Sequence, residues 1–129
     1  MIISDTPFPK FSKYHEHFEL FPNIFNLVDD FAIFVLNVIP EIDKDTKEMY
    51  PKLFDNDHLK ARSEFYGVDN PKNISIDMMV MAYSKYARRN GYKLVWHFSE
   101  QFGSNRIQLA YYCVFMIEKI KQSWILIMV

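Results

Sequence analysis

Gly91 separates two parts of the chain whose apolar residues follow different spacings. Before Gly91, apolar side chains recur at the i, i+3, i+4 and i+7 positions that form one face of a helix. From Tyr92 onward, apolar and polar residues alternate, as in a strand with one buried face. Since one kind of element cannot satisfy both periods, the sequence predicts an α+β fold.

About four helices are expected in the part that covers residues 12–91. The first follows the candidate cap Ser12, and the fourth begins after Ser75 and ends at Gly91. Between them lies an apolar segment with a narrow polar stripe, which indicates a helix buried on most of its circumference. The expected helices span residues 12–21, 24–39, 56–66 and 76–90.

A meander of three antiparallel strands is expected in residues 92–129. The segment "GSN" at 103–105 predicts a hairpin loop, and "SWILIMV" predicts the last strand. Residues 107–121 can also be written as a helix, but their aromatic and β-branched content favours a strand. Strict alternation places Trp96 and Phe98 on the buried face of the first strand and His97 on its wet face.

The helices are expected to pack on one face of this curved antiparallel sheet. With 129 residues, the chain is predicted to form a single domain, residues 1–129. The order of elements is similar in outline to the cone-shaped pocket folds of the NTF2-like group. That similarity rests on shape and assigns no residue.

The composition argues against several classes of protein. Fifteen basic and sixteen acidic residues give a net charge of -1, whereas a nucleic-acid-binding protein is expected to carry a positive excess. Cys113 is the only cysteine, which indicates a reducing compartment. The N-terminal "MIISDTPFPK" does not resemble a secretory signal, and "EKIKQ" interrupts the apolar C-terminal stretch. We therefore expect a cytoplasmic protein without a membrane partner.

No motif predicts a metal or another cofactor. His15 and His17 in "YHEHFELF" diverge on a helix, because residues two apart do not share a helical face. The calcium-loop pattern fails in "DNDH" at 55–58, since Lys60 and Tyr66 stand where glycine and glutamate are needed. Asp55 is instead expected to cap the helix that follows.

The leading hypothesis is a non-catalytic protein-binding module, such as an inhibitor or an immunity-type protein that neutralises a toxin. A charged interface with aromatic anchors would suit this role. An acidic segment, 41–57, would meet a basic protein, and a basic segment surrounds the end of the fourth helix. The candidate partner-binding residues are Asp43, Asp45, Asp55, Asp57, Arg88 and Arg89.

Two alternatives stay open. In a pocket protein, either a ligand carrier or an isomerase- or dehydratase-like enzyme, Asp30 and His97 would act as general acid and base beside Tyr83 or Tyr111. In a dimeric accessory subunit, an apolar C-terminal strand at the sheet edge would pair with another copy. Because no catalytic constellation stands out, the sequence favours the non-enzymatic hypothesis.

Overall fold

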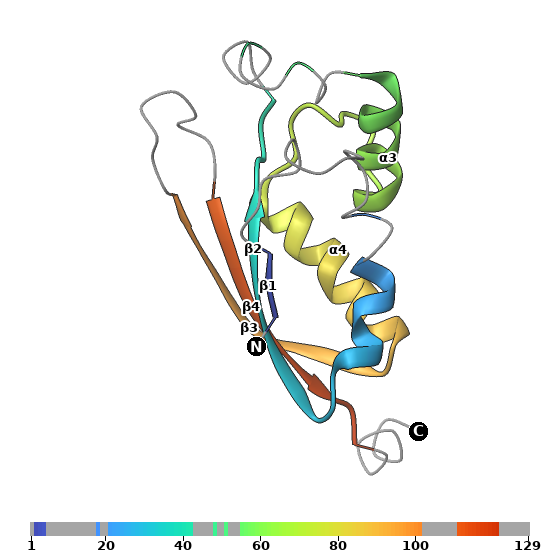
Figure 1. Cartoon of the computed structure of the whole chain (residues 1–129), viewed down its shortest axis with the longest axis vertical. Coiled ribbons are helices and arrows are strands. Elements are labelled where there is room, and N and C mark those ends of the chain that lie inside the picture. Colours follow the sequence, from blue (N-terminus) through green and yellow to red (C-terminus); the bar gives the residue numbers. More distant parts are fainter. Residues whose placement is uncertain are drawn as a thin grey trace.

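The structure is a computed structural model that describes residues 2–4 (backbone only), 18, 21–42, 48, 51, 55–101 and 111–121. Within these residues the strands are β1 (Ile2–Ser4), β2 (Phe31–Val38), β3 (Tyr92–Gln101) and β4 (Tyr111–Lys119). The helices are the 3-10 helix η2 (Phe21–Leu27) and the α-helices α3 (Asn56–Tyr66) and α4 (Ile76–Arg89). Figure 1 shows the helices together on one side of the sheet.

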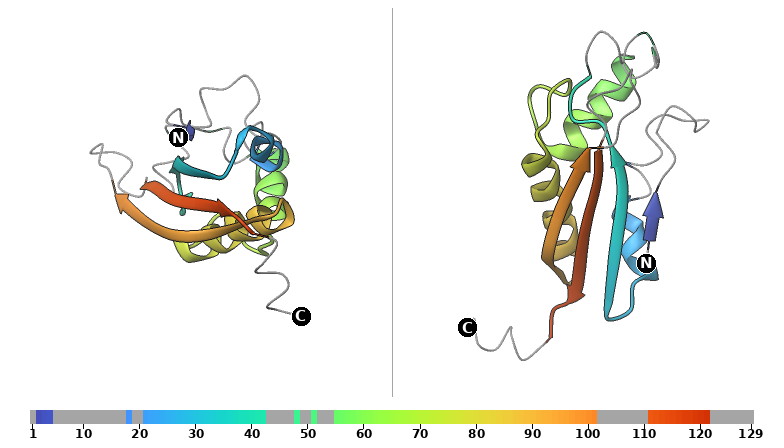
Figure 2. Two further views of the ribbon diagram at one scale, coloured as in Figure 1. Left: turned by 90° about the horizontal axis from the view of Figure 1, so that it is seen from below. Right: turned by 90° about the vertical axis from the view of Figure 1, so that its left-hand side faces the viewer.

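The described strands form one sheet in the order β1-β2-β4-β3. Strand β4 pairs antiparallel with both β2 and β3, and the short β1 runs parallel to β2. Seen from the left-hand side of Figure 1, the sheet lies in front of α3 and α4 (Figure 2, right). The predicted α+β class is confirmed, and the described helices lie on one face of the sheet. Strands β2, β4 and β3 are antiparallel as predicted, whereas the parallel strand β1 was not expected.

The prediction of a helix at 24–39 is wrong. Only η2 is helical in this segment, and β2 follows after a bend at Asp29 and Asp30. Apart from Asn37, strand β2 carries apolar side chains on both faces, so it lacks the alternation that identifies a half-buried strand.

The predicted C-terminal meander is therefore only partly correct. Strands β3 and β4 are adjacent as expected, but the third antiparallel strand among the described residues is β2, which precedes α3 and α4. About four helices were expected, whereas the described residues contain three. The predicted strand at 123–129 and most of the predicted helix at 12–21 lie outside the described residues.

Both predicted α-helices at 56–66 and 76–90 are confirmed, and so are the end signals Ser75 and Gly67, whereas the predicted side-chain cap by Asp55 is wrong. The Ser75 hydroxyl accepts a hydrogen bond from the Met78 amide (3.1 Å), which caps α4. Asp55 stands at the N-cap position of α3 but makes no side-chain cap hydrogen bond. Gly67 ends α3 with φ 67°, the left-handed conformation that glycine adopts without steric cost.

The core lies between α4 and the sheet and is mostly aromatic. The ring of Phe115 on β4 stacks on Phe34 of β2 at 4.8 Å and on Tyr83 of α4 at 5.2 Å. At the other end of the sheet, the Tyr92 hydroxyl donates a hydrogen bond to the Val28 carbonyl (2.7 Å). These contacts attach η2, β2, β3 and α4 to one hydrophobic cluster.

Arg62 of α3 connects this helix to the segment that follows β2 and to the segment that precedes α4. Its guanidinium is buried and donates hydrogen bonds to the carbonyls of Ile39 (2.6 Å), Pro40 (2.8 Å) and Pro71 (2.5 Å). Backbone hydrogen bonds from Ile74 to Pro40 and from Ile42 to Lys72 hold the same two segments together. A planar guanidinium suits this site because its donors reach several carbonyls at once.

Val95 interrupts the pairing of β3 and reverses the faces that alternation predicts. Leu94 pairs with Ile117 and Trp96 pairs with Met116, so Val95 is an extra residue in a β-bulge. Paired residues share a face of the sheet, and Ile117 points into the core whereas Met116 does not. Trp96 and Phe98 therefore lie on the face away from the helices, not on the buried face that was predicted.

Candidate protein-binding surface

The sheet face opposite the helices carries a group of apolar side chains that no described helix covers (Figure 2). We call it the open sheet face. The register places the side chains in cross-strand rows, two of which are entirely apolar. The open sheet face consists of Ile33 and Val35 of β2, Val114 and Met116 of β4, and Trp96 and Phe98 of β3, with Phe31 at one end.

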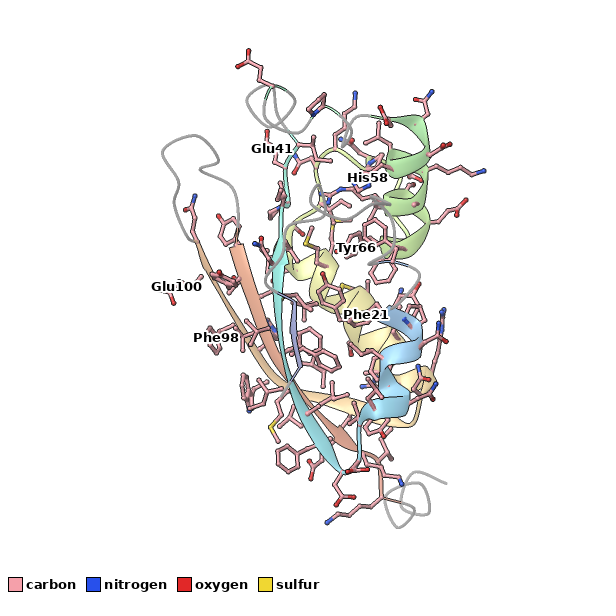
Figure 3. The ribbon with its side chains drawn as sticks, in the orientation of Figure 1. Phe21, Glu41, His58, Tyr66, Phe98 and Glu100 are labelled. Atoms are coloured by element: carbon pink, nitrogen blue, oxygen red, sulfur yellow. The ribbon has the colours of Figure 1, made fainter. Side chains whose placement is uncertain are left out.

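The two aromatic residues of β3 are the most prominent side chains of this face. The rings of Trp96 and Phe98 stack at 6.0 Å between centroids with an interplanar angle of 18°. Trp96 is 39% and Phe98 is 52% exposed, and Phe31 is 61% exposed. Figure 3 shows Phe98 projecting from β3 away from the helix layer, in contrast to Phe21 and Tyr66.

Exposed aromatic residues grouped in this way make the open sheet face a candidate contact surface. Monomeric proteins bury most large apolar side chains, and contiguous exposed apolar patches mark sites of interaction. Tryptophan in particular is enriched among the residues that dominate binding energy at protein interfaces. The neighbouring half-buried residues Ile33, Val35, Val114 and Met116 would extend the contact around Trp96 and Phe98.

Polar residues border the open sheet face at both ends of the strands. At one end, the Lys93 ammonium lies 3.9 Å from the Glu118 carboxylate, in a cross-strand pair. At the other end, Glu100 pairs with Tyr112 in the register and points away from the helices (Figure 3). An apolar centre with a polar rim is the usual anatomy of a protein interface.

The structure does not bring the residues of the pocket hypothesis together. The Asp30 carbonyl accepts a hydrogen bond from the Lys119 amide (2.7 Å), whereas Tyr111 begins β4 at its opposite end. At the rise of a strand, those ends of β4 are about 26 Å apart. His97 is on the helix side of β3 because it pairs with Phe115, but its side chain is exposed.

Tyr83, the fourth residue of that hypothesis, is buried in the core beside Tyr66, Arg62 and Cys113. The Tyr66 and Tyr83 hydroxyls are 2.8 Å apart, and the Arg62 guanidinium lies 5.9 Å from the Tyr66 ring centroid. Burial raises the pKa of Tyr66 to about 12, and burial raises the pKa of Cys113 to about 12. Burial, and then the neighbouring Tyr66, raise the pKa of Tyr83 well above its ordinary value.

Burial also lowers the pKa of Arg62, although the nearby tyrosines oppose this effect. These pKa shifts arise because burial removes water from around the side chains. A nucleophile or a base would instead need to be exposed. The hydrogen bond between the Tyr66 and Tyr83 hydroxyls joins α3 to α4 inside the core.

The charged residues of the protein-binding hypothesis are described only in part. Asp55 and Asp57 are exposed at the start of α3, and Arg88 and Arg89 are exposed at the end of α4. The Arg89 guanidinium lies 5.4 Å from the ring centroid of Tyr86 on the same helix. Asp43 and Asp45 lie outside the described residues.

Within the described residues, no three side chains of histidine, cysteine, aspartate or glutamate are grouped as metal ligands would be. His15 and His17 are not among these residues. None of the helices described is both long and apolar enough to span a membrane.

Sequence reasoning missed the open sheet face because it depends on β2 being a strand and on the bulge at Val95. The run "VWHF" at 95–98 contained a signal, since three of its four residues are apolar and alternation cannot bury Val95 and Trp96 on the same face. Comparison with protein-family models, curated proteins and solved structures finds no match for this chain.

Proposed function

We propose that this chain is a non-catalytic protein-binding module that binds its partner through the open sheet face. The observation that supports the proposal is the exposed stack of Trp96 and Phe98 within an apolar face bordered by Lys93, Glu118 and Glu100. Aromatic anchors inside a polar rim are the arrangement in which a few side chains supply most of the binding energy.

Photo-cross-linking tests the proposal directly. A benzophenone amino acid is introduced at Phe98 on the open sheet face or, as a matched control, at Met81 of α4. Met81 is 59% exposed, similar to Phe98, but belongs to the helix layer. We expect a protein adduct from position 98 in the cells that produce the chain, and none from position 81. Equal adducts at both positions, or none at position 98, would contradict the proposal.

The inhibitor or immunity-type form of this function adds a basic partner, which the acidic segment 41–57 would recognise. Asp55 and Asp57 support it because both are exposed and lie two residues apart at the start of α3. The test is affinity capture with Asp43, Asp45, Asp55 and Asp57 all replaced by lysine. Loss of a basic protein from the captured set supports this form, whereas unchanged recovery of every partner removes it.

A further inference from the structure

We propose that the partner of the open sheet face is a second copy of this chain, packed face to face as a two-fold sandwich of two sheets. This inference rests on the proposed function, because it names the protein that the face would bind. It differs from pairing at a strand edge, which would extend one sheet instead of stacking two.

The open sheet face has a pattern that a two-fold axis maps onto itself. Four cross-strand rows follow one another along the strands, two apolar rows in the middle and one polar or mixed row at each end. An isologous interface needs this symmetry, because each row must meet its complement on the other copy. The rows are Lys93/Glu118/Phe31, Trp96/Met116/Ile33, Phe98/Val114/Val35 and Glu100/Tyr112/Asn37.

An axis across the strands, between the two apolar rows, gives complementary contacts. It places Trp96 of one copy over Phe98 of the other, so that aromatic side chains meet along the two facing β3 strands, at one side of the interface. It also places Lys93 of one copy over Glu100 of the other, twice in each dimer. The strands of the two sheets then run antiparallel, close to the aligned packing of β-sandwiches.

An axis along the strands would give a worse arrangement. It would place the row that contains Glu118 over the same row of the other copy, and an axis that runs over β4 would bring the two Glu118 carboxylates together. Like charges in opposition suppress such a mode of association. The charges therefore select the axis that lies across the strands.

Edge pairing through β3 is also disfavoured. The bulge at Val95 breaks the row of backbone groups that another strand would need, and charged residues stand near both ends of the strand. Natural proteins use bulges and charges in this way to prevent edge-to-edge association. A net charge of -1 adds little general repulsion between copies.

Sedimentation velocity across the micromolar range measures the proposed dimer. We expect a concentration-dependent monomer–dimer equilibrium for the wild-type chain, and a monomer for Trp96→Glu and Phe98→Glu. Met81→Glu is the matched control, since it adds the same charge at an exposed apolar position of α4 and should leave dimerisation unchanged. Equal loss of dimer in the control would overturn the inference.

A charge-swap pair tests the predicted contact itself. Lys93→Glu alone and Glu100→Lys alone each place like charges in opposition at two equivalent contacts, so each variant should dimerise about tenfold more weakly. Mixing the two variants restores opposite charges at both contacts, so the mixture should form a heterodimer of near wild-type affinity. A mixture that stays as weak as its components would overturn the inference.

The outcomes separate this inference from the proposed function. A wild-type chain that stays monomeric, and that forms adducts at position 98 with a different protein, would overturn the dimer and leave the binding module intact. A monomer that forms no adduct at position 98 would overturn both. Sedimentation of the wild-type monomer with phosphatidylcholine vesicles, lost in Phe98→Glu, would assign the face to lipid instead and overturn both.

Discussion

The hydroxyl of Tyr66 on α3 lies 2.8 Å from the hydroxyl of Tyr83 on α4, and both side chains are buried. This hydrogen bond joins the two α-helices inside the core, where neither oxygen can exchange its partner for bulk water. Loss of one partner in such a pair costs more than loss of both, because the remaining hydroxyl stays buried.

A double-mutant cycle on these tyrosines should show this asymmetry. We expect Tyr66→Phe and Tyr83→Phe each to lower the free energy of unfolding by about 1–2 kcal/mol, and the double variant to lose less than the sum. Urea denaturation of all four proteins measures the coupling. Tyr86→Phe, a half-buried tyrosine on α4, serves as the control. Strictly additive losses would contradict a direct hydrogen bond.

Stability should fall in alkaline solution because of the same cluster. The pKa of Tyr66 is raised from 10.0 to about 12, and that of Cys113 from 9.0 to about 12. Between these values the unfolded chain releases protons that the folded chain retains, so each group lowers the stability by up to about 1.4 kcal/mol per pH unit. The contribution is intact below pH 9 and lost as the pH rises toward 12.

Urea denaturation between pH 8 and pH 11 checks this dependence. The Tyr66→Phe/Tyr83→Phe variant should show a shallower decline, because the two phenols no longer titrate. A decline of the same slope in both proteins would assign the alkaline sensitivity to other groups.

Replacement of Arg62 should be among the most destabilising single changes in the described part of the chain. Its guanidinium donates to three carbonyls from two segments, and all three acceptors lose a charged donor in Arg62→Met. We expect a loss of about 3–5 kcal/mol. Arg62→Lys should recover little, because an ammonium group lacks the planar fork.

Lys60→Met is the control for this change. Lys60 is an exposed basic residue of the same helix, and its replacement should alter stability by no more than about 0.5 kcal/mol. Thermal and urea denaturation measure both variants. Similar losses for Lys60→Met and Arg62→Met would contradict the role of the buried hydrogen bonds.

Deletion of Val95 should be tolerated, since the remaining residues of β3 keep their partners on β4. Leu94 stays opposite Ile117 and Trp96 stays opposite Met116, so neither face changes. We expect the free energy of unfolding to change by about 1 kcal/mol or less. Acrylamide should quench the fluorescence of Trp96 as strongly as before, measured in a Trp124→Phe background so that Trp96 is the only tryptophan. Deletion of Val114 from the regular ladder should abolish cooperative unfolding. A buried Trp96 after deletion of Val95 would contradict the bulge.

The sequence identified the elements whose ends carry local signals. Ser75 and Gly67 mark ends of α4 and α3, and regular alternation in β4 places Cys113 and Phe115 in the core. These features depend on side chains within a turn or two of one another, so no tertiary information was needed.

The errors arose where packing between distant segments decides the structure. Residues 31–38 are apolar on both faces except for Asn37, and only their pairing with β4 distinguishes a strand from a buried helix. No glycine, the residue that often marks a β-bulge, lies beside Val95 in β3, so the sequence predicts unbroken alternation there. The open sheet face requires both features, which is why the candidate site could not be read from the sequence.

The order of the strands has a consequence for biosynthesis. Phe34 on β2 stacks on Phe115 of β4, which the ribosome adds only after both α-helices have been made. During translation, β2 is therefore an apolar segment that cannot yet pair with β4, and such unpaired apolar segments are prone to aggregate. Chaperones that bind exposed apolar segments of nascent chains would therefore be expected to recognise Phe31–Val38.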